Sequence, residues 1–312
     1  MTALISGSFA FDNIMVFNDR FANHILPDQV HILNVSFLVP EMRREFGGCA
    51  GNIAFNVRLL GGHGVPLATV GADFDGYADW MERWGIPSDY VRVIDDHYTA
   101  QAFITTDLDD NQIIAFHPGA MGEAHRVNVP TGFDNAVGIV APNGRDAMIQ
   151  HARQFREAGI PFVFDPGQGL PMFDGDDLRT FIDQATWVAV NDYESQLIQD
   201  RTGLGLEEIA ELVDALIVTR GPKGSWIFTG GQRLDIPAAE PDAVNDPTGC
   251  GDAYRAGLLY GLERDMPWEH TGRLASLMGA IKIATHGTQN HHFELDELRR
   301  RYQQSFGETA PL

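Results

Sequence analysis

The chain has 312 residues, of which 44% are hydrophobic and 21% are charged. This composition supports a large hydrophobic core and excludes a disordered or low-complexity protein, so we expect one domain spanning 1–312. The 43 acidic and 22 basic residues give a formal charge of −21. An acidic surface repels nucleic acids and anionic lipid headgroups, and neither a nucleic acid nor a membrane is an expected partner.

The N-terminal residues carry no Lys or Arg ahead of a short apolar stretch, and no run of about 18 apolar residues occurs, which predicts a cytoplasmic protein. Cys49 and Cys250 are the only cysteines. Two cysteines are too few for a disulfide framework, and no His or Cys pattern has the spacing of a zinc site.

Short apolar runs rich in β-branched residues alternate with segments of helical periodicity, which is typical of a parallel sheet connected by helices. The predicted strands cover residues 3–8, 66–72, 137–142, 161–166, 187–190 and 215–221. The predicted helices cover residues 49–60, 74–84, 144–158, 175–185, 192–201, 207–213, 250–263, 268–285 and 294–306. This alternation predicts an α/β fold.

Two regions, about 10–45 and 88–118, break the alternation. They contain strand-like pieces such as NVSFLV and QAFITT with no helix between them. We expect them to form a small β lid above the carboxyl ends of the parallel strands, where ligands bind in such sheets. The alternative is an ordinary hairpin at the edge of the sheet.

The segment DPTGCGDAYRAG, residues 246–257, predicts a turn that opens a helix. The N–H groups of Gly249, Cys250 and Gly251 would converge on an anion at the positive end of the helix dipole. A carboxylate beside such a site is useful if it takes a proton from a hydroxyl that attacks a phosphorus atom, and we assign this role to Asp252. The alternative is that Asp252 merely stabilises the first helical turn.

The presence and absence of other glycine motifs narrow the choice of enzyme class. The chain has neither G-x-x-x-x-G-K-[ST] nor G-x-G-x-x-G after a strand, which argues against P-loop kinases and typical dinucleotide dehydrogenases. In GGCAGN, Gly47 and Gly48 would let the backbone approach a ligand, and Asn52 offers both a donor and an acceptor. Asp12, after the first strand, could bind two vicinal hydroxyls or could be a turn residue.

Five ordered segments together resemble the ribokinase-like carbohydrate and nucleoside kinase family, often called the PfkB family. They are Asp12, the GGxxxN motif, the 246–257 segment, NDYE at 191–194 and TRGPKG at 219–224. The resemblance implies a three-layer αβα sandwich and an ATP site that includes Asn191, Thr219, Gly221, Gly224, Gly249 and Gly251. It implies Mg²⁺ held mostly through water by Asn191 and Glu194, and in some members K⁺ at carbonyls around Asp246 and Thr248.

Residues 21–42 look like the lid of bacterial adenosine kinases within this family. This resemblance implies phosphoryl transfer from ATP to the 5′-hydroxyl of adenosine, giving AMP, and a homodimer formed through the lid. Phe103 and Phe116 would hold the adenine ring, and Gln168 would face the base, although Gly169 stands where those enzymes have a second polar side chain. The substrate-binding residues implied are Ser8, Asp12, Ser36, Gly47, Gly48, Asn52, Phe103, Phe116 and Gln168.

Two alternatives remain open for the function. The chain could phosphorylate another nucleoside or sugar, such as inosine, guanosine or ribose, or it could be an inactive nucleoside sensor. The retained Asp252, loop glycines and Glu194 argue against the sensor. Cys250 is expected to be an inert thiol, with oxidation sensitivity as a hypothesis because a helix N-terminus lowers the pKa of a thiol.

Overall fold

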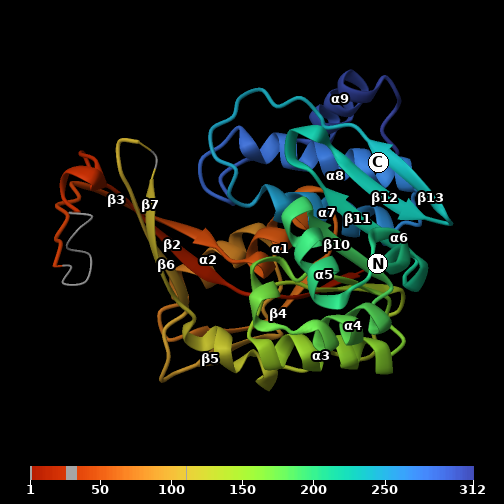
Figure 1. The fold of residues 1–312 in the computed structure, drawn as a ribbon, viewed down its shortest axis with the longest axis horizontal. Helices are drawn as coiled ribbons and strands as arrows, with labels where there is room; N and C mark the ends of the chain where they lie inside the picture. The colour runs from red at the N-terminus through yellow and green to blue at the C-terminus, as the bar shows by residue number, and fades with distance from the viewer. Residues whose placement is uncertain (1, 26–33, 110) are drawn as a thin grey trace.

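The computed structural model describes residues 2–25, 34–109 and 111–312, and its centre is a nine-stranded sheet (Figure 1). The strand order is β13-β12-β11-β10-β9-β8-β1-β4-β5. The seven strands from β11 to β5 pair in parallel. These strands are β1 (Thr2–Ser6), β4 (Gly64–Gly71), β5 (Val91–Ile94), β8 (Ala136–Val140), β9 (Phe162–Phe164), β10 (Trp187–Asn191) and β11 (Ala215–Thr219).

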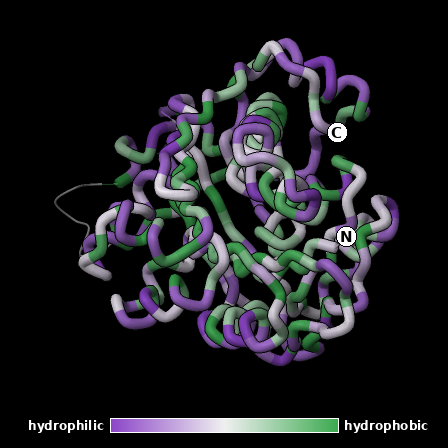
Figure 2. Tube along the Cα trace, turned by 90° about the vertical axis from the view of Figure 1, so that its right-hand side faces the viewer, coloured by the Kyte–Doolittle hydropathy of each residue, from purple (hydrophilic) through white to green (hydrophobic). Residues whose placement is uncertain are grey.

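Helices cover both faces of this sheet and bury its side chains in two hydrophobic clusters. One face packs against α1 (Cys49–Leu59), α2 (Asp75–Trp84), α7 (Cys250–Leu262), α8 (Trp268–Ile283) and α9 (Leu295–Phe306). The other face packs against α3 (Arg145–Glu157), α4 (Gly175–Gln184), α5 (Asp192–Thr202) and α6 (Leu206–Leu212). Figure 2 shows hydrophobic segments crossing the middle of the molecule. Among the described residues, no helix is long and apolar enough to cross a membrane.

The predicted α/β fold is confirmed, and each predicted strand and helix is present with its ends shifted by a few residues. The antiparallel hairpin of β12 (Ser225–Thr229) and β13 (Gln232–Ile236) was not predicted. It is joined by Gly230 and Gly231, which both have positive φ. A pair of glycines between two short strands is a standard signal for such a hairpin.

A second, smaller sheet projects from the body at the left of Figure 1. It consists of β2 (Ala10–Val16), β3 (Glu41–Gly47), β6 (Ala100–Thr106) and β7 (Gln112–His117), in the order β3-β2-β6-β7. We call these four strands the small sheet. Because they form a sheet of their own, the alternative of an edge hairpin is wrong.

The boundaries of the small sheet differ from those expected. Within NVSFLV, residues 34–39 form no strand, and β3 begins at Glu41 instead. The first part of the 88–118 region also differs, because β5 pairs in parallel with β4 and belongs to the main sheet. Residues 26–33 of the expected lid lie outside the described residues.

The position of α7 depends on a close approach between α7 and α8. A Cβ atom added at Gly257 would lie 2.6 Å from Cα and 2.9 Å from the backbone nitrogen of Ala275. Backbone atoms of a packed helix cannot move away as a flexible side chain can. The absence of a side chain at Gly257 therefore lets α7 pack this closely against α8.

We expect Gly257→Ala to lower the free energy of unfolding by about 1–3 kcal/mol, because the added methyl group overpacks the α7–α8 contact. Gly76→Ala in α2 is the matched control, since nothing lies within 4 Å of its added Cβ. Gly76 lies in the first turn of α2, so this change is expected to stabilise the protein by less than about 1 kcal/mol. Urea denaturation measures both, and equal effects would contradict the packing argument.

Candidate active site

The motifs identified in the sequence gather at the carboxyl edge of the main sheet. The chain leaves β1 toward β4 on one side and later returns to β8 on the other. The backbone N–H of Ser8 bonds the carbonyl oxygen of Pro142 at 3.1 Å, which joins the segments that follow β1 and β8. In open α/β sheets ligands bind at such a reversal of strand order.

The segment 246–249 forms a tight turn at the start of α7. Gly249 is the N-cap residue with φ of 79°, and an added Cβ would lie 2.9 Å from Cγ2 of Thr288. Gly251 is exposed, and nothing lies within 4 Å of its added Cβ, so an anion can approach the backbone there. The expectation for Cys250 needs correction, because its N–H bonds the carbonyl oxygen of Pro247 at 3.2 Å within the turn. The N–H groups of Gly249 and Gly251 remain available to a ligand.

Asp252 lies in the first turn of α7, half-buried beside α1. Its Oδ2 accepts a hydrogen bond of 2.8 Å from Nδ2 of Asn52. Burial raises the pKa of Asp252 to about 6, and Asp165 adds to the shift while Asn52 and Arg255 oppose it. A carboxylate with this pKa is ionised at neutral pH and is still a stronger base than an ordinary aspartate, which suits a general base.

A chain of buried hydrogen bonds fixes the orientation of the Asn52 amide. The indole N–H of Trp80 can only donate, and it donates to Oε1 of Gln289 at 3.0 Å. The amide nitrogen of Gln289 therefore faces Oδ1 of Asn52, at 2.9 Å. This leaves the Asn52 amide nitrogen facing Asp252. Neither Gln289 nor Trp80 is among the residues predicted from the sequence, and no local pattern marks either one.

A buried ion pair lies beneath this part of α7. Arg255 forms two hydrogen bonds with the Asp165 carboxylate, of 2.9 and 3.1 Å, and each residue is 5% exposed. Arg255 also donates to the carbonyl oxygen of Ala189 at 3.3 Å. The pair thus ties α7 to the ends of β9 and β10. The sequence analysis did not identify it, although an acidic residue directly after a buried strand was the available signal.

The start of α1 and the small sheet meet at Asp12. A Cβ added at Gly47 would lie 2.6 Å from Oδ2 of Asp12, and one added at Gly48, where φ is +86°, would lie 2.5 Å from the carbonyl oxygen of Ser8. The Ser8 hydroxyl accepts a hydrogen bond of 3.3 Å from the Cys49 N–H. Burial raises the pKa of Asp12 to about 6, with further contributions from Asp246 and Glu45.

The register of the small sheet places Phe103 and Phe116 on opposite faces. Asp12 pairs with Ala102, which pairs with Phe116, so these three side chains share one face. Phe103 is the neighbour of Ala102 along β6, so its side chain points to the opposite face. The expectation that both rings hold one adenine is therefore wrong within a single chain. Phe116, 53% exposed, is the one on the face of Asp12.

Ser36, expected among the substrate-binding residues, and Gln168, expected to face the nucleobase, are both exposed. Ser36 lies in the segment before β3, and Gln168 lies in the 3₁₀ helix η4 (Gly167–Met172). Neither side chain forms a hydrogen bond in the part of the chain that the structure describes. Their roles remain predictions from the resemblance.

The residues expected around the nucleotide follow β10 and β11. Asn191 and Glu194 form a capping box at the start of α5, in which each side chain bonds the backbone of the other. Asn191 and Thr219 are paired at the ends of their strands. Position 224 requires glycine, because φ there is +80° and an added Cβ would lie 2.0 Å from the carbonyl oxygen of Ile236. Gly221 also has positive φ and open space around it.

Glu194 is the acidic side chain of the nucleotide region that the resemblance assigns to Mg²⁺. Burial raises its pKa, and Asp165 and Asp192 lie close enough to add to the shift. Among the described residues, no three His, Cys, Asp or Glu side chains cluster as a metal site. Mg²⁺ usually keeps several of its waters and binds through one or two carboxylates together with substrate phosphates. Asn191 and Glu194 therefore fit the water-mediated role expected of them.

The two cysteines are free thiols. Burial raises the pKa of Cys250 to about 11, and Asp246 and Asp252 add to the shift while Lys282 opposes it. Burial likewise raises the pKa of Cys49. The hypothesis of a lowered thiol pKa at the start of α7 is thus wrong, and Cys250 fits the expected inert residue.

A cavity of about 1230 Å³ lies at the opposite, amino edge of the main sheet, where Pro161, Thr186 and Asp214 precede their strands. None of the motif residues lines it. The chemistry at the carboxyl edge therefore locates the candidate site better than cavity size does.

Comparison with known proteins identifies relatives over most of the chain. The family model described as pfkB family carbohydrate kinase matches residues 13–294. A nucleoside kinase from Methanocaldococcus jannaschii is 30% identical over 260 residues, which cover 83% of this chain and 85% of that protein.

Two solved structures are similar over nearly their whole length. The nucleoside kinase of Burkholderia thailandensis in complex with inosine has a TM-score of 0.90 and 52% identity, covering 98% of this chain and 99% of that one. The M. jannaschii nucleoside kinase structure has a TM-score of 0.89 and 28% identity, covering 97% and 98%. The three-layer ribokinase-like fold expected from the resemblance is confirmed.

We expect Arg255→Met to lower the free energy of unfolding by about 3–5 kcal/mol, because it leaves the Asp165 carboxylate buried without a partner. The double variant Arg255→Met with Asp165→Asn should recover part of the loss. Arg299→Met is the control, since its pair with Asp296 is exposed and contributes at most about 1 kcal/mol. Equal losses for Arg255→Met and Arg299→Met in chemical denaturation would contradict the buried pair.

Proposed function

Because this chain belongs to the pfkB family of carbohydrate kinases, we propose that it is a nucleoside kinase, which transfers the γ-phosphoryl group of ATP to the 5′-hydroxyl of a purine nucleoside. The observation that carries the proposal is the arrangement at the start of α7. A carboxylate with a pKa of about 6 lies next to backbone N–H groups that can receive an anion. Phosphoryl transfer to a hydroxyl needs both groups in one place.

In the proposed reaction Asp252 accepts the proton of the 5′-hydroxyl as the hydroxyl oxygen bonds to the γ-phosphorus. The bond between that phosphorus and the bridging oxygen of ADP breaks, so the products are the nucleoside 5′-monophosphate and ADP. The N–H groups of Gly249 and Gly251, at the positive end of α7, stabilise the charge on the transferred group. When bound near Asn191 and Glu194, Mg²⁺ would neutralise charge on the nucleotide phosphates.

The nucleoside would bind between α1 and the small sheet. Asp12 can accept hydrogen bonds from the two ribose hydroxyls, and Asn52 on α1 donates a hydrogen bond to Asp252. Phe116 lies in the same row as Asp12, two strands away, or about 10 Å, so its ring can stack on the base of the same molecule. This placement supports a ligand that consists of a ribose and a flat base.

Adenosine is the acceptor that the sequence resemblance implies, and we propose it first. Inosine is a second candidate, because the B. thailandensis kinase with 52% identity was solved in complex with inosine. Gly169 has no side chain that could select between the two bases. A coupled assay of ADP release with adenosine, inosine, guanosine and ribose separates these candidates, and no turnover with any of them would favour the sensor alternative.

We also propose that the small sheet is a lid and that two copies pair through it. The face opposite Asp12 exposes apolar side chains, including Met42 at 69%, Phe103 at 42% and Ile113 at 43%. Exposed apolar side chains beside unpaired strand edges are normally covered by a partner. A second copy of this chain would cover them and leave the face of Asp12 free for substrate.

Asp252→Asn is expected to lower kcat by about 10² to 10⁴, because the amide keeps the size of the side chain and cannot accept the proton. In the wild type, kcat/KM, which reports the free enzyme, should fall as the pH drops below about 6, where the Asp252 carboxylate becomes protonated. Asn52→Ala removes a hydrogen bond that lowers this pKa, so it should move the acid limb to higher pH. Steady-state kinetics of the wild type, Asp252→Asn and Asn52→Ala from pH 5 to 8 measures these three effects.

A loss of kcat smaller than about tenfold in Asp252→Asn would overturn the role of Asp252 as the base. Nucleoside binding, measured by calorimetry, provides the control for folding. It should stay close to wild type in Asp252→Asn.

Phe116→Ala is expected to weaken adenosine and inosine binding by about 1–3 kcal/mol, which is typical for loss of one base–aromatic stack. Ribose binding should not change, because ribose has no base. Phe103→Ala is the matched control, since its ring lies on the other face of the small sheet. Calorimetry gives the affinities, and sedimentation gives the monomer–dimer equilibrium, which Phe103→Ala should shift toward monomer.

Equal loss of ribose and nucleoside binding in Phe116→Ala would contradict stacking. Equal loss of nucleoside binding in the two phenylalanine variants would contradict the assignment of the base to one face.

A further inference from the structure

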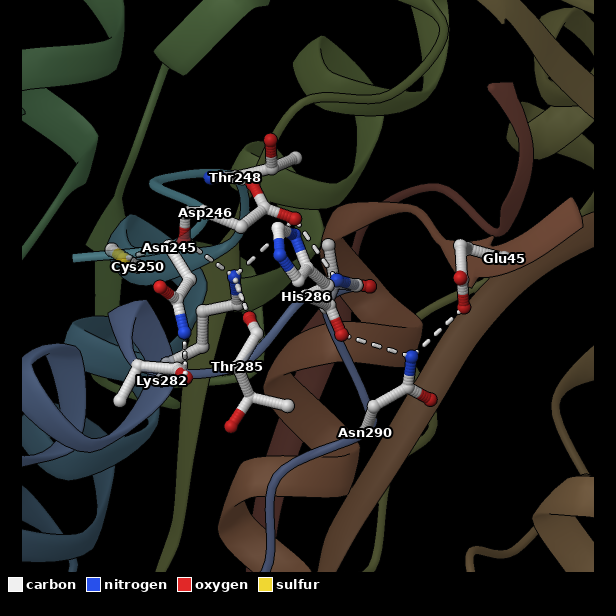
Figure 3. A network of polar contacts seen from close by, with 12 residues as sticks. Glu45, Asn245, Asp246, Thr248, Cys250, Lys282, Thr285, His286 and Asn290 are labelled. Atoms are coloured by element: carbon white, nitrogen blue, oxygen red, sulfur yellow. Dashed lines mark hydrogen bonds and ion pairs between the residues drawn. The ribbon is translucent and has the colours of Figure 1, made fainter. Parts of the chain in front are cut away.

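Lys282, near the end of α8, is one of only two lysines in the chain, and its side chain is fully buried. Its Nζ donates to the carbonyl oxygen of Asp246 at 2.7 Å and to that of Thr285 at 3.2 Å. Nζ also lies 3.9 Å from Oδ2 of Asp246 (Figure 3). A lysine is rarely buried unless its charge is paired, so these contacts need an explanation.

The surroundings of Nζ favour a protonated amine. Both bonded atoms are carbonyl oxygens, which only accept hydrogen bonds, and an ammonium group has three N–H donors and no acceptor. A neutral amine could also donate to two carbonyl groups, but only an ammonium group offsets the negative charge of the Asp246 carboxylate, whose Oδ2 lies 3.9 Å away. Lys282 is therefore a buried cation held between two carbonyl groups and a carboxylate.

This cation joins the turn before α7 to the segment after α8. The N–H groups of Asn245 and Asp246 both bond the carbonyl oxygen of Ile283, at 2.9 and 3.1 Å. The Asp246 carboxylate accepts hydrogen bonds of 2.9 Å from the N–H groups of Thr248 and Gly287. Lys282 lies at the centre of these contacts (Figure 3). Its charge thus fixes the turn that leads to Gly249.

The same segment reaches the small sheet. Asn290 Nδ2 donates to the carbonyl oxygen of His286 and to Oε2 of Glu45 on β3, at 3.0 and 2.9 Å (Figure 3). The Thr288 hydroxyl donates to the carbonyl oxygen of Phe46 at 2.6 Å. The turn held by Lys282 is therefore connected to the base of the small sheet.

A potassium site was expected at the carbonyl groups around Asp246 and Thr248, and the residues present do not fit it. Protein carbonyl oxygens bind K⁺ by replacing its hydration shell, and the Asp246 carbonyl oxygen is already bonded to Lys282. A K⁺ ion bound to this oxygen would lie directly beside the ammonium group of Lys282. The two positive charges would repel each other.

We propose that the ammonium group of Lys282 takes the place of a monovalent cation beside the anion-binding turn, so that the enzyme works without K⁺. The ammonium group binds carbonyl oxygens, as a K⁺ ion would, and it supplies a fixed positive charge near the start of α7. This inference rests on the proposed function, because it assumes that the turn before α7 receives the transferred phosphoryl group.

The test compares two variants of one position. Lys282→Ala removes the charge and leaves space for a small cation, whereas Lys282→Met removes the charge and fills most of the space. Arg273→Ala, on the same helix and paired with exposed Glu308, is the control. Activity and melting temperature are measured in N-methylglucamine chloride, with KCl or NH₄Cl substituted at constant ionic strength.

The wild type and Arg273→Ala should change rate by less than about twofold when KCl or NH₄Cl is added. Lys282→Ala should lose at least about tenfold in kcat and regain part of it with KCl or NH₄Cl, and these salts should raise its melting temperature, since a ligand of the folded state stabilises it. Lys282→Met should lose kcat by a similar factor, and neither salt should restore its kcat or raise its melting temperature appreciably.

A wild-type enzyme that K⁺ activates about tenfold would overturn the proposal, even if the Lys282 variants failed to fold. An equal response of Lys282→Ala and Lys282→Met to the salts would also overturn it, because the cation would then bind elsewhere. The melting temperatures require no nucleoside, so they decide this inference separately from the proposed function.

Discussion

The candidate site depends most on the hydrogen bond between Asn52 and Asp252, which joins two helices that are 200 residues apart in sequence. Both α1 and α7 begin at the carboxyl edge of the main sheet, and this bond fixes their N-termini relative to each other. The acceptor nucleoside and the transferred phosphoryl group would bind at these two N-termini. Trp80 and Gln289 determine which end of the Asn52 amide faces the carboxylate. The Asp252 carboxylate, the nucleoside hydroxyl and the anion site would thus be brought together by one chain of hydrogen bonds.

Two buried cations, Arg255 and Lys282, offset acidic side chains near the start of α7. The chain has a formal charge of −21, and its average field repels ATP. Arg255 and Lys282 place positive charge close to the start of α7, where the helix dipole is also positive. Each is paired with a carboxylate, Asp165 or Asp246, which offsets the cost of burying it. Each ion pair is neutral overall, so Asp165 and Asp246 add no net negative charge beside the positive end of α7.

Sequence patterns predicted the elements and the motif positions, because buried strands and glycine turns have local signals. The hairpin of β12 and β13 was missed although Gly230 and Gly231 mark it. The opposite faces of Phe103 and Phe116 could not be predicted, because a shift of one residue in the pairing of β6 and β7 exchanges the faces. The partners of Arg255 and Lys282 lie 90 and 36 residues away, and no local pattern specifies such contacts. The resemblance to known kinases supplied the chemistry that links the motifs.

The most direct test of the account is the pKa of the Asp252 carboxyl group in the folded, ligand-free protein. Carbon-13 NMR of labelled aspartate carboxyls, with Asp252→Asn for assignment, measures it without any assumption about substrate. The account predicts titration near pH 6, because burial disfavours the charged form. Titration near the ordinary value of 3.8 would mean that Asp252 is no stronger a base than a surface aspartate, and would contradict the account.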